Sequence, residues 1–417
     1  MKRLKSSTKY LALCYILIFN LTTSSMKIAT GSSDKTVRIW DVETGTCEKV
    51  LKGHEDAVNS VSFGPHGKKV GSCSYDKTVR IWDLETGTCK VLKGHYDNVK
   101  SVSFGPYGKK VASCSYDNTI RIWNIEAGQS TVLEENRFIY LEAVSFNPNG
   151  KMLAFGRSNG TVGIWDGKKS KVLGRHFCSV RSVSFGPYGK KIASGDCDGI
   201  IRIWDLEAGT CKVLEGHNFF ADSISFGPYG KKLASCSTSN VVSIWNLETN
   251  PSSFVKTSED RSTSSLRPCS GQAGHKALKG HTDKVMAVSF GPYGKKVASA
   301  SKDNTVRIWD LETNLHKVLE GHTSWVSSVA FNSFKAIIKK KEEELMKKKL
   351  LRLAHKKKLN VAAIVFSNNS NLENSSNTIL GKRPLQPWPN SRRSQGQRSR
   401  DENDLELPFK RRKVTKK

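Results

Sequence analysis

Histidine, serine and aspartate recur as a set along this chain, and together these side chains could form a nucleophilic triad. One set is His54, Ser74 and Asp76, in which aspartate would orient histidine and histidine would take the serine proton. A catalytic set is needed only once, whereas a structural unit recurs. Comparable sets accompany several of seven regularly placed tryptophans, so their repetition favours a structural role. These tryptophans are Trp40, Trp82, Trp123, Trp165, Trp204, Trp245 and Trp309.

The tryptophans mark a repeat. Their spacings are 42, 41, 42, 39, 41 and 64 residues, and each follows Ile and precedes Asp or Asn. Within one unit, the segments VKSVSF, KKVASCS, TIRIWN and the CKVLKGH type alternate or are β-branched, and turn signals such as GPYG and YDN separate them. Four short strands repeated at this period predict a β-propeller.

Gly-His pairs add a more specific signal. Five of them stand at 53–54, 94–95, 216–217, 280–281 and 321–322, and in all but the last of these cases Trp-Asp or Trp-Asn follows 28 residues after the histidine. Over about residues 26–332 the chain therefore resembles the WD-repeat family. The resemblance implies an all-β, seven-bladed WD-repeat β-propeller.

The resemblance also assigns the polar sets to a buried network in which Asp holds His, His holds Ser, and Ser meets the tryptophan indole. A hydroxyl bonded to an indole is not a poised nucleophile, and buried indole and imidazole groups need such partners. Counted as repeat positions, the network residues are His54, Ser74, Asp76, Trp82, His95, Ser115, Asp117, Trp123, His281, Ser301, Asp303, Trp309, His322, Ser32, Asp34 and Trp40.

Three blades depart from the pattern. In the fourth blade, Arg137 stands for His, Arg157 for Ser and Asn159 for Asp. Asp196 stands for Ser in the fifth blade, and Ser239 stands for Asp in the sixth. We expect these blades to be looser, or their positions to be released for another use.

Counting strands predicts how the ring closes. Lys27 to Trp40 supplies the second and third strands of a blade without a first, and Val326 to Phe331 supplies a first strand with nothing after it. The last strand should complete the first blade, which pairs His322 with Asp34 and removes two exposed edges. The alternative uses Leu11 to Phe19 as the missing strand, although this run lacks the VxSVSF pattern.

The ten cysteines are interpreted as small core residues. Cys73, Cys114 and Cys236 each lie nine residues before a repeat tryptophan, and other cysteines lie seven after one. Repeat positions favour packing over a disulfide or metal framework, and no CxxC or HExxH motif is present. We therefore expect no metal site, no cofactor and no catalytic residue.

The family resemblance also implies a protein-binding face at the mouth of the central channel. It places there the residues three and five after each repeat histidine and the residue before each turn aspartate. Aromatic groups beside charges fit the composition of binding hot spots. The predicted face comprises Trp325, Phe220, Tyr140, Asn98, Lys100, Glu142, Arg181, Asp222, Met286, Lys284, Tyr75, Tyr116 and Lys302.

Lysines are predicted to ring the opposite rim, with His66, Tyr107, Tyr188, Tyr229 and Tyr293 between them. They follow the turns GPHG, GPYG and NPNG, which are also simply good soluble turns copied with the repeat. A basic rim with interleaved aromatics could instead track phosphates and stack bases. The rim lysines are Lys68, Lys69, Lys109, Lys110, Lys151, Lys190, Lys191, Lys231, Lys232, Lys295 and Lys296.

The segments outside the repeats are basic or polar. Residues 1–25 read as a secretory signal peptide or a disordered arm, with an apolar run too short to span a membrane. Residues 247–274 read as a Ser-rich loop insertion, 333–360 as a basic helix and 361–417 as a disordered basic tail. A basic run resembles a nuclear import signal, Lys410, Arg411, Arg412 and Lys413. Cleavage of 1–25 would indicate secretion; otherwise a nuclear or cytoplasmic location is expected.

These observations leave three functional hypotheses. The first is a monomeric, non-catalytic scaffold that mediates interactions with other proteins, as the resemblance implies. The second is a nucleic-acid-associated protein that uses the lysine rim and the basic tail. A weaker alternative is a ubiquitin-ligase substrate receptor, suggested only by the short stretch from Trp165 to Lys168.

Overall fold

The structure is a computed structural model, and it describes residues 26–135, 139–214, 217, 220–248, 254–255 and 275–332. Contacts divide the chain into two units, residues 1–348 and 349–417. The expected N-terminal arm, basic helix, basic tail and nuclear signal lie outside the described residues, as does Arg137.

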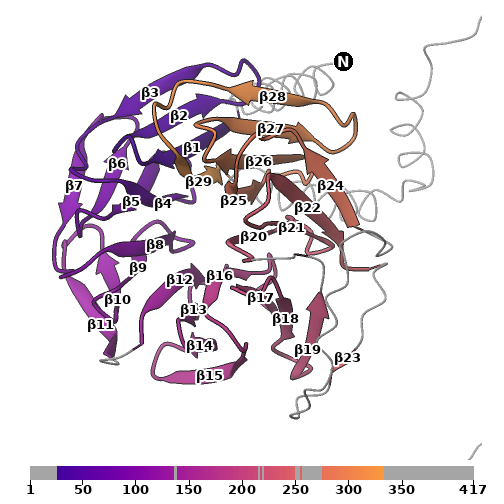
Figure 1. Ribbon diagram of the computed structural model, residues 1–417. Coiled ribbons are helices and arrows are strands. Elements are labelled where there is room, and N and C mark those ends of the chain that lie inside the picture. The colour runs from indigo at the N-terminus through magenta and orange to yellow at the C-terminus, as the bar shows by residue number, and fades with distance from the viewer. Residues whose placement is uncertain are drawn as a thin grey trace, which may run out of the picture. The chain divides into compact units, whose positions relative to one another are not determined.

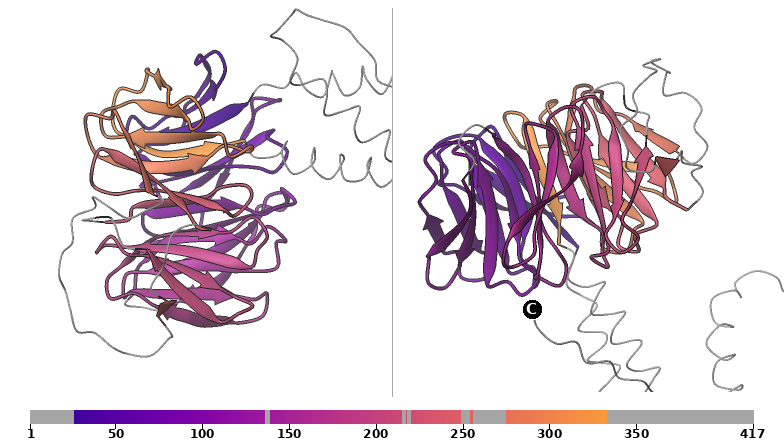
Figure 2. Two further views of the ribbon diagram at one scale, coloured as in Figure 1. Left: turned by 90° about the vertical axis from the view of Figure 1, so that its right-hand side faces the viewer. Right: turned by 90° about the horizontal axis from the view of Figure 1, so that it is seen from below.

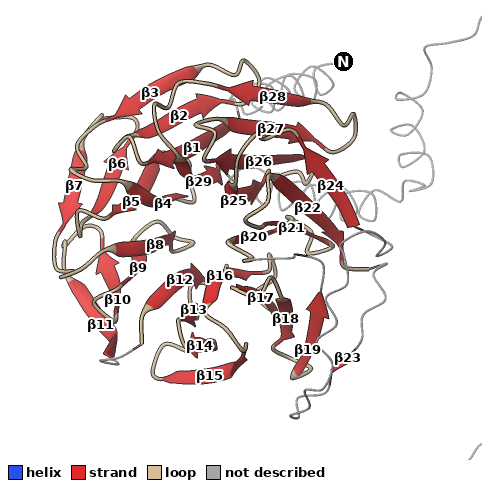
Figure 3. Ribbon diagram, viewed as in Figure 1, coloured by secondary structure: helices blue, strands red, loops and turns tan. Residues whose placement is uncertain are grey.

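The described residues form a ring of seven antiparallel sheets, or blades, numbered here from the first tryptophan (Figure 1). All regular elements among them are strands (Figure 3). The first blade contains β29 (Val326–Phe331), β1 (Lys27–Ser32), β2 (Val37–Asp41) and β3 (Cys47–Leu51). The second blade contains β4 (Val58–Phe63), β5 (Lys69–Ser74), β6 (Val79–Asp83) and β7 (Cys89–Leu92). The third contains β8 (Val99–Phe104), β9 (Lys110–Ser115), β10 (Thr119–Asn124) and β11 (Ser130–Glu135). The fourth contains β12 (Leu141–Phe146), β13 (Leu153–Arg157), β14 (Thr161–Trp165) and β15 (Ser170–Arg175). The fifth blade contains β16 (Val180–Phe185), β17 (Lys191–Asp196), β18 (Ile201–Asp205), β19 (Thr210–Leu214) and β23 (Phe254–Val255). The sixth contains β20 (Ser223–Phe226), β21 (Lys232–Cys236), β22 (Val241–Asn246) and β24 (His275–Lys279). The seventh contains β25 (Val285–Phe290), β26 (Lys296–Ser301), β27 (Val306–Asp310) and β28 (His316–Leu319). The predicted all-β, seven-bladed fold is confirmed.

The core lies between neighbouring blades. The second strand of each blade is buried almost throughout, as in Lys110–Ser115, whereas outer strands such as Cys47–Leu51 are mainly exposed. Trp123 and Val111 of the third blade pack with Ile81 of the second in one buried cluster. Each blade thus covers the next one, which is how a propeller buries apolar surface without a single central core.

The ring closes with the last strand, as predicted. β29 pairs antiparallel with β1, and Ala29 lies opposite Ala330. In Figure 1 the orange β29 lies beside the indigo β1. The alternative in which Leu11 to Phe19 fills this place is wrong, because β1 already has β2 and β29 on its two sides.

The Ser-rich insertion between β22 and β24 contributes one short strand. β23 pairs with the outer strand β19, where Val255 lies opposite Cys211. This makes the fifth blade a five-stranded sheet. The prediction of a loop over 247–274 is therefore corrected for these two residues. Figure 2 shows the ring from two further directions.

Two cysteines differ from the core interpretation. Cys178 and Cys197 form a disulfide with a Cα–Cα distance of 5.6 Å, which is within the usual range. Cys178 lies in the connection from the fourth blade to the fifth and Cys197 in the loop after β17, away from the repeat positions that favour packing. Cys73, Cys114, Cys211 and Cys236 are buried as expected, but Cys47 is partly buried and Cys89 is exposed. Disulfide bonding also occupies the two sulfurs that, with Asp198, form a possible metal-binding group.

Among the described residues, no helix is long and apolar enough to cross a bilayer.

Candidate functional site

The second blade shows the polar network in full. His54 Nδ1 lies 2.7 Å from Asp76 Oδ2, and His54 Nε2 lies 2.7 Å from Ser72 Oγ. The indole nitrogen of Trp82 donates to the same Ser72 oxygen at 2.8 Å. A continuous chain from carboxylate to indole therefore runs through the blade.

The serine in this chain is not the one that the sequence indicated. Ser74 stands two residues later, at the end of β5, where its hydroxyl donates to the carbonyl of Asp56 and accepts from the backbone N–H of Asp76. Its local bond to residue i+2 is a typical turn interaction, so Ser74 is used by the turn rather than by the histidine. The same correction applies to Ser115, Ser301 and Ser32, whose places in the network are taken by Ser113, Ser299 and Thr30.

The network of the first blade spans the ring closure. His322, which precedes β29, bonds Asp34 Oδ2 at 2.7 Å and Thr30 Oγ1 at 2.7 Å. Trp40 donates its indole N–H to Thr30 at 2.8 Å. The third and seventh blades repeat the arrangement through His95, Asp117, Ser113 and Trp123, and through His281, Asp303, Ser299 and Trp309.

The fifth blade also holds a complete network, contrary to the expectation of a looser blade. His176 bonds Asp196 at 2.9 Å and Ser194 at 2.7 Å, and Trp204 donates to Ser194 at 2.7 Å. Asp196 does stand at the turn-serine position, but its carboxylate reaches the histidine. His176 is not part of a Gly-His pair, because Arg175 precedes it. The count of 18 residues from His to Ser and ten from Ser to Trp would have found it.

The sixth blade keeps the inner part of the chain. His217 lies 2.6 Å from Ser235 Oγ, and Trp245 donates to the same oxygen at 2.7 Å. Ser239, at the aspartate position, lies 3.1 Å from the hydroxyl of Ser237.

The fourth blade replaces the polar chain with packing. Phe155 is fully buried at the serine position, ten residues before Trp165. Its ring fills the space above Gly163, where an added Cβ would come within 2.2 Å of it. The guanidinium of Arg157 lies 4.7 Å from the centre of the Phe155 ring, and Arg157 Nη1 donates to Thr161. Trp165 is only partly buried, unlike the other six repeat tryptophans.

The charge states fit a structural role for these networks. Burial lowers the pKa of His95, His176 and His281, although the neighbouring aspartates oppose this effect. For Asp117, burial would raise the pKa, but the hydrogen bond and charge of His95, together with Thr119, lower it overall. At neutral pH the pair is therefore a neutral imidazole and a carboxylate. The imidazole donates from Nδ1 to the carboxylate and accepts the serine proton at Nε2, while the serine oxygen accepts from the indole. Every group has a partner, so the serine is not a free nucleophile.

A second group of polar residues lies at the predicted channel mouth. Lys100, Glu142 and Arg181 are the second residues of β8, β12 and β16, and Asp222 directly precedes β20. Arg181 lies between the two acids, 3.8 Å from Glu142 and 3.4 Å from Asp222. Lys284 Nζ is 2.8 Å from Asp222 Oδ2, as an ion pair. Charges of alternating sign thus follow one another across neighbouring blades.

Aromatic rings accompany these charges. Lys100 lies over Tyr75 and Tyr116, at 5.6 and 5.0 Å from the ring centres. Tyr116 also lies 5.1 Å from Tyr140, centre to centre. Phe220 lies beneath both Arg181 and Lys284, at 5.7 and 5.6 Å. We call this connected set the mouth cluster: Tyr75, Lys100, Tyr116, Tyr140, Glu142, Arg181, Phe220, Asp222 and Lys284.

Four predicted face residues lie outside the mouth cluster. Lys302 and Trp325 form a pair of their own, with the ammonium 3.8 Å from the indole ring centre. Asn98 accepts a backbone bond from Tyr116 through its carbonyl, and Met286 is the second residue of β25. Asn59 and Ser327 hold the same second positions in β4 and β29, and counting strand positions would have added them.

The predicted basic rim is largely neutralised. Seven of its lysines form ion pairs, and the partners are acidic side chains in turns between third and fourth strands or at their ends. The pairs are Lys68–Glu85, Lys69–Asp83, Lys190–Glu207, Lys191–Asp205, Lys231–Glu248, Lys295–Glu312 and Lys296–Glu43. Among the residues that the structure describes, Lys109, Lys110, Lys151 and Lys232 are in no ion pair. Lys68 and Glu85 are 17 residues apart and flank the paired strands β5 and β6 of one blade, so they meet only once these strands are paired.

Two family models match the chain. The model described as IFT122 first beta-propeller matches residues 14–175, and the model described as WD domain, G-beta repeat matches residues 167–205, 209–246, 274–310 and 313–338.

Among curated proteins, single segments are similar. Nuclear distribution protein PAC1 of Mycosarcoma maydis is 51% identical over 43 residues, which is 10% of either chain. Ribosome assembly protein 4 of Chaetomium thermophilum is 53% identical over 45 residues, or 11% of this chain and 9% of that protein. A Lissencephaly-1 homolog of Caenorhabditis briggsae is 49% identical over 43 residues, or 10% and 11%. Each similarity thus spans about a tenth of the relative's length, which is the size of one repeat.

Proposed function

Because this chain belongs to the WD-repeat family of β-propellers, we propose that it is a non-catalytic scaffold that binds other proteins through the mouth cluster and the neighbouring Trp325. Apart from Phe220, the residues of this face lie in, directly before or directly after strands of the propeller, which limits the ordering that a partner must impose on binding.

The observation that carries this proposal is the exposure of large aromatic side chains on one face. Trp325 is 50% exposed, Tyr140 52% and Phe220 39%. Aromatic residues beside arginine and lysine are the residues that most often dominate binding energy at protein interfaces. The acids of the mouth cluster already pair with Arg181 and Lys284, which limits the cost of covering these charges with a partner.

The propeller's histidine networks support the non-catalytic part of the proposal. Their hydroxyls are buried and already bonded to indole nitrogens, as for Ser72 and Trp82. The ubiquitin-ligase hypothesis receives no comparable support from Trp165 to Lys168, where Asp166 instead accepts bonds from the backbone of its own turn.

A capture experiment tests the proposal. The wild-type chain, a Phe220→Ala/Trp325→Ala variant and a Tyr188→Ala control are immobilised, and captured proteins are quantified by mass spectrometry. Tyr188 is 64% exposed in the turn before β17, outside the predicted face, so its loss controls for a missing surface aromatic. We expect at least one partner to fall about tenfold or more with the double variant and to be retained by the control, since a hot-spot residue contributes 2 kcal/mol or more. If all partners are captured equally by the three proteins, this face is not the binding site.

A further inference from the structure

Two surface hollows occupy equivalent places between neighbouring blades, at the turns that carry the lysines. The hollow between the fifth and sixth blades has a volume of about 410 Å³, and that between the third and fourth about 310 Å³. Phe226 lines the first at the position that Phe146 has in the second. The repeat therefore supplies two sites in equivalent places, which differ in volume and in the side chains around them.

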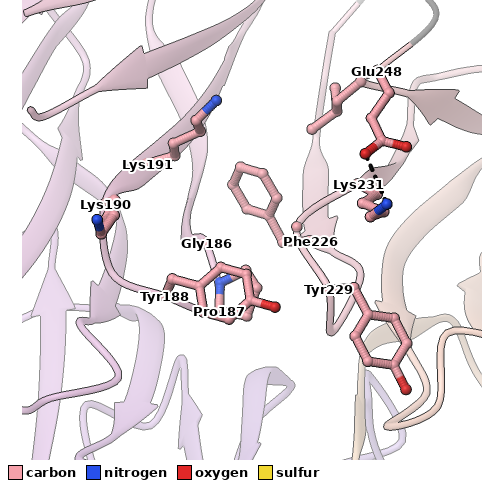
Figure 4. Close-up of a pocket in the computed structure, with 11 residues that line it drawn as sticks. Gly186, Pro187, Tyr188, Lys190, Lys191, Phe226, Tyr229, Lys231 and Glu248 are labelled. Carbon is pink, nitrogen blue, oxygen red and sulfur yellow. Dashed lines mark ion pairs between the residues drawn. The ribbon is translucent and has the colours of Figure 1, made fainter. Parts of the chain in front are cut away.

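In the larger hollow, every lining lysine has an acidic partner. Lys231 lies 2.9 Å from Glu248, and Figure 4 shows this pair at the edge of the hollow. Lys190 is paired with Glu207 at 3.0 Å and Lys191 with Asp205 at 3.6 Å. This hollow has little charge left for an anion.

The smaller hollow has the same lysines without those partners. Lys110 and Lys151 correspond to Lys191 and Lys231, but Asn124 replaces the aspartate and Lys168 replaces the glutamate. Within the described part of the chain, none of Lys110, Lys151 and Lys168 is in an ion pair. All three are exposed, so their charges remain available to a ligand.

The acid that lines the smaller hollow is engaged by its own turn. Asp166 lines the hollow, and its carboxylate accepts the backbone N–H groups of Lys168 and Lys169 at 3.0 and 3.1 Å. Backbone bonds, chiefly that of Lys169, lower the pKa of Asp166, so it stays ionised. One carboxylate against three lysines leaves the hollow with a net positive charge, and Lys169 and Lys171 follow closely in the sequence.

Aromatic surface adjoins these charges. Trp165 and Phe146 line the hollow. Trp165 is partly uncovered in the blade whose network serine is replaced by Phe155. Tyr107 is 71% exposed, and its ring lies 3.4 Å from the Cβ position of Gly150, another lining residue. Flat apolar rings beside unpaired lysines are the combination that single-stranded nucleic acids require.

We propose that the hollow between the third and fourth blades binds single-stranded nucleic acid. Lys110, Lys151 and Lys168 contact the phosphates, and an unstacked base lies against Tyr107 and Trp165. A duplex keeps its bases stacked and would leave the aromatic surface unused, and an acidic peptide would use the lysines alone. This function is separate from protein binding at the mouth cluster, and it confines the charge available on the lysine rim to one pair of blades.

The matched hollows provide the main test. The binding of a fluorescent oligothymidylate about 20 nucleotides long to the full chain is measured by fluorescence anisotropy. The salt concentration starts at about 50 mM and is then raised, in the range where phosphate contacts dominate. The site variant is Lys110→Gln/Lys151→Gln/Lys168→Gln, and the control is Lys190→Gln/Lys191→Gln/Lys231→Gln. Both lose three charges from exposed side chains and both retain the basic C-terminal residues, so the difference between them isolates the hollow.

We expect the site variant to bind at least tenfold more weakly and the control to stay within about twofold of the wild type. The slope of log affinity against log salt should become shallower by about 2 in the site variant. Each lysine–phosphate contact with a single strand contributes about 0.7 to this slope, and the variant loses three such contacts. Equal losses in the two variants would overturn the proposal, since they would reflect overall charge. Absence of binding by the wild type would overturn it as well.

A second pair of variants tests base stacking. Tyr107→Ala removes the ring beside the proposed site, and Tyr188→Ala removes its counterpart at the larger hollow, where Tyr188 is 64% exposed. We expect about tenfold weaker binding for Tyr107→Ala, within the range measured for stacked aromatics, and no change for Tyr188→Ala. Poly-glutamate is the competitor in both assays. If it displaces the oligonucleotide at equal charge concentration and Tyr107→Ala has no effect, the hollow binds acidic protein segments and the proposal is wrong.

Discussion

The first and fourth blades reach the same architecture by different means. The first joins β29 to β1 across the whole length of the propeller and contains the network of Asp34, His322, Thr30 and Trp40. The fourth is built from four consecutive strands, β12 to β15, and buries Phe155 where that network would be. Both are four-stranded antiparallel sheets in one ring (Figure 1).

The comparison shows that the polar network is not required for a blade to form. Three net hydrogen bonds stabilise by about 1.5 to 4.5 kcal/mol together. Burial of one phenylalanine stabilises by about 1.5 to 3 kcal/mol. The two solutions are therefore of similar value, and strand pairing with packing between blades sets the architecture in both. The network differs in being directional, so it fixes His322 relative to β1 at the closure.

Shortening the chain should break the first blade and has the largest expected effect. A chain that ends at residue 320 loses β29, whose Val326, Val329 and Phe331 are buried. Their burial stabilises by about 5 to 9 kcal/mol, which is much of the stability of a typical domain. We expect this chain to melt far lower, or without cooperativity, in a thermal unfolding experiment. A chain that ends at residue 335 is the control, and equal melting of the two would contradict the closure.

Removing one hydroxyl should separate the two blade types more finely. Thr30→Val keeps the shape of the side chain but leaves the Trp40 indole and His322 Nε2 without their partner. Two orphaned buried groups should destabilise the chain by about 2 to 6 kcal/mol, measured by urea unfolding. Ser32→Ala is the matched control, because among the described residues the Ser32 hydroxyl bonds the backbone of Asp34 and Ser324 and no side chain of the network. A loss of about 1 kcal/mol is expected. A larger loss for Ser32→Ala than for Thr30→Val would mean that Ser32, as the sequence indicated, is the network residue.

Acid should destabilise the blades that contain the histidine network and leave the packing of Phe155 in the fourth blade unaffected. The pKa of His281 in the folded chain lies below 6.5, its ordinary value, mainly because of burial. Stability from such a histidine is present above pH 6.5 and is lost as the pH falls below it, because the unfolded chain takes up protons first. Asp303 extends the loss below its ordinary pKa of 3.8. We expect lower urea midpoints at pH 5.5 than at pH 7.5, with a smaller difference in His281→Gln. A midpoint that rises on acidification would refute the assignment of neutral histidines.

Repetition made the fold predictable from the sequence. Seven tryptophans, the Gly-His pairs and the unmatched Val326 to Phe331 were enough to predict the blades and the closure. Within a repeat, however, Ser72 and Ser74 both lie in the second strand, and spacing alone does not tell which one meets the histidine. Only the cross-strand position of Trp82, opposite Val70, brings its indole to Ser72.

The candidate sites were less predictable, because they depend on contacts between paired strands and between blades. The mouth residues could be named from their positions, but the alternation of Glu142, Arg181 and Asp222 required three neighbouring blades to be in place. In the sequence, nothing distinguished the rim lysines from one another as candidates for binding phosphate. Their acidic partners divide them into neutralised and available groups, and the sequence gives no sign of the Cys178–Cys197 disulfide between two loops.

The pairing of β1 with β29 also governs when the ring can be finished during synthesis. Ala29 cannot pair with Ala330 until the chain between them has been made. At about 5 to 20 residues per second, the ribosome needs about 15 to 60 s for this. Throughout that interval the edge of β1 is open, with Ile28 and Ala29 uncovered on the side that β29 will occupy. The nascent chain is therefore exposed to aggregation at its N-terminal blade until β29 has been made, and chaperones that bind exposed strand edges would act there.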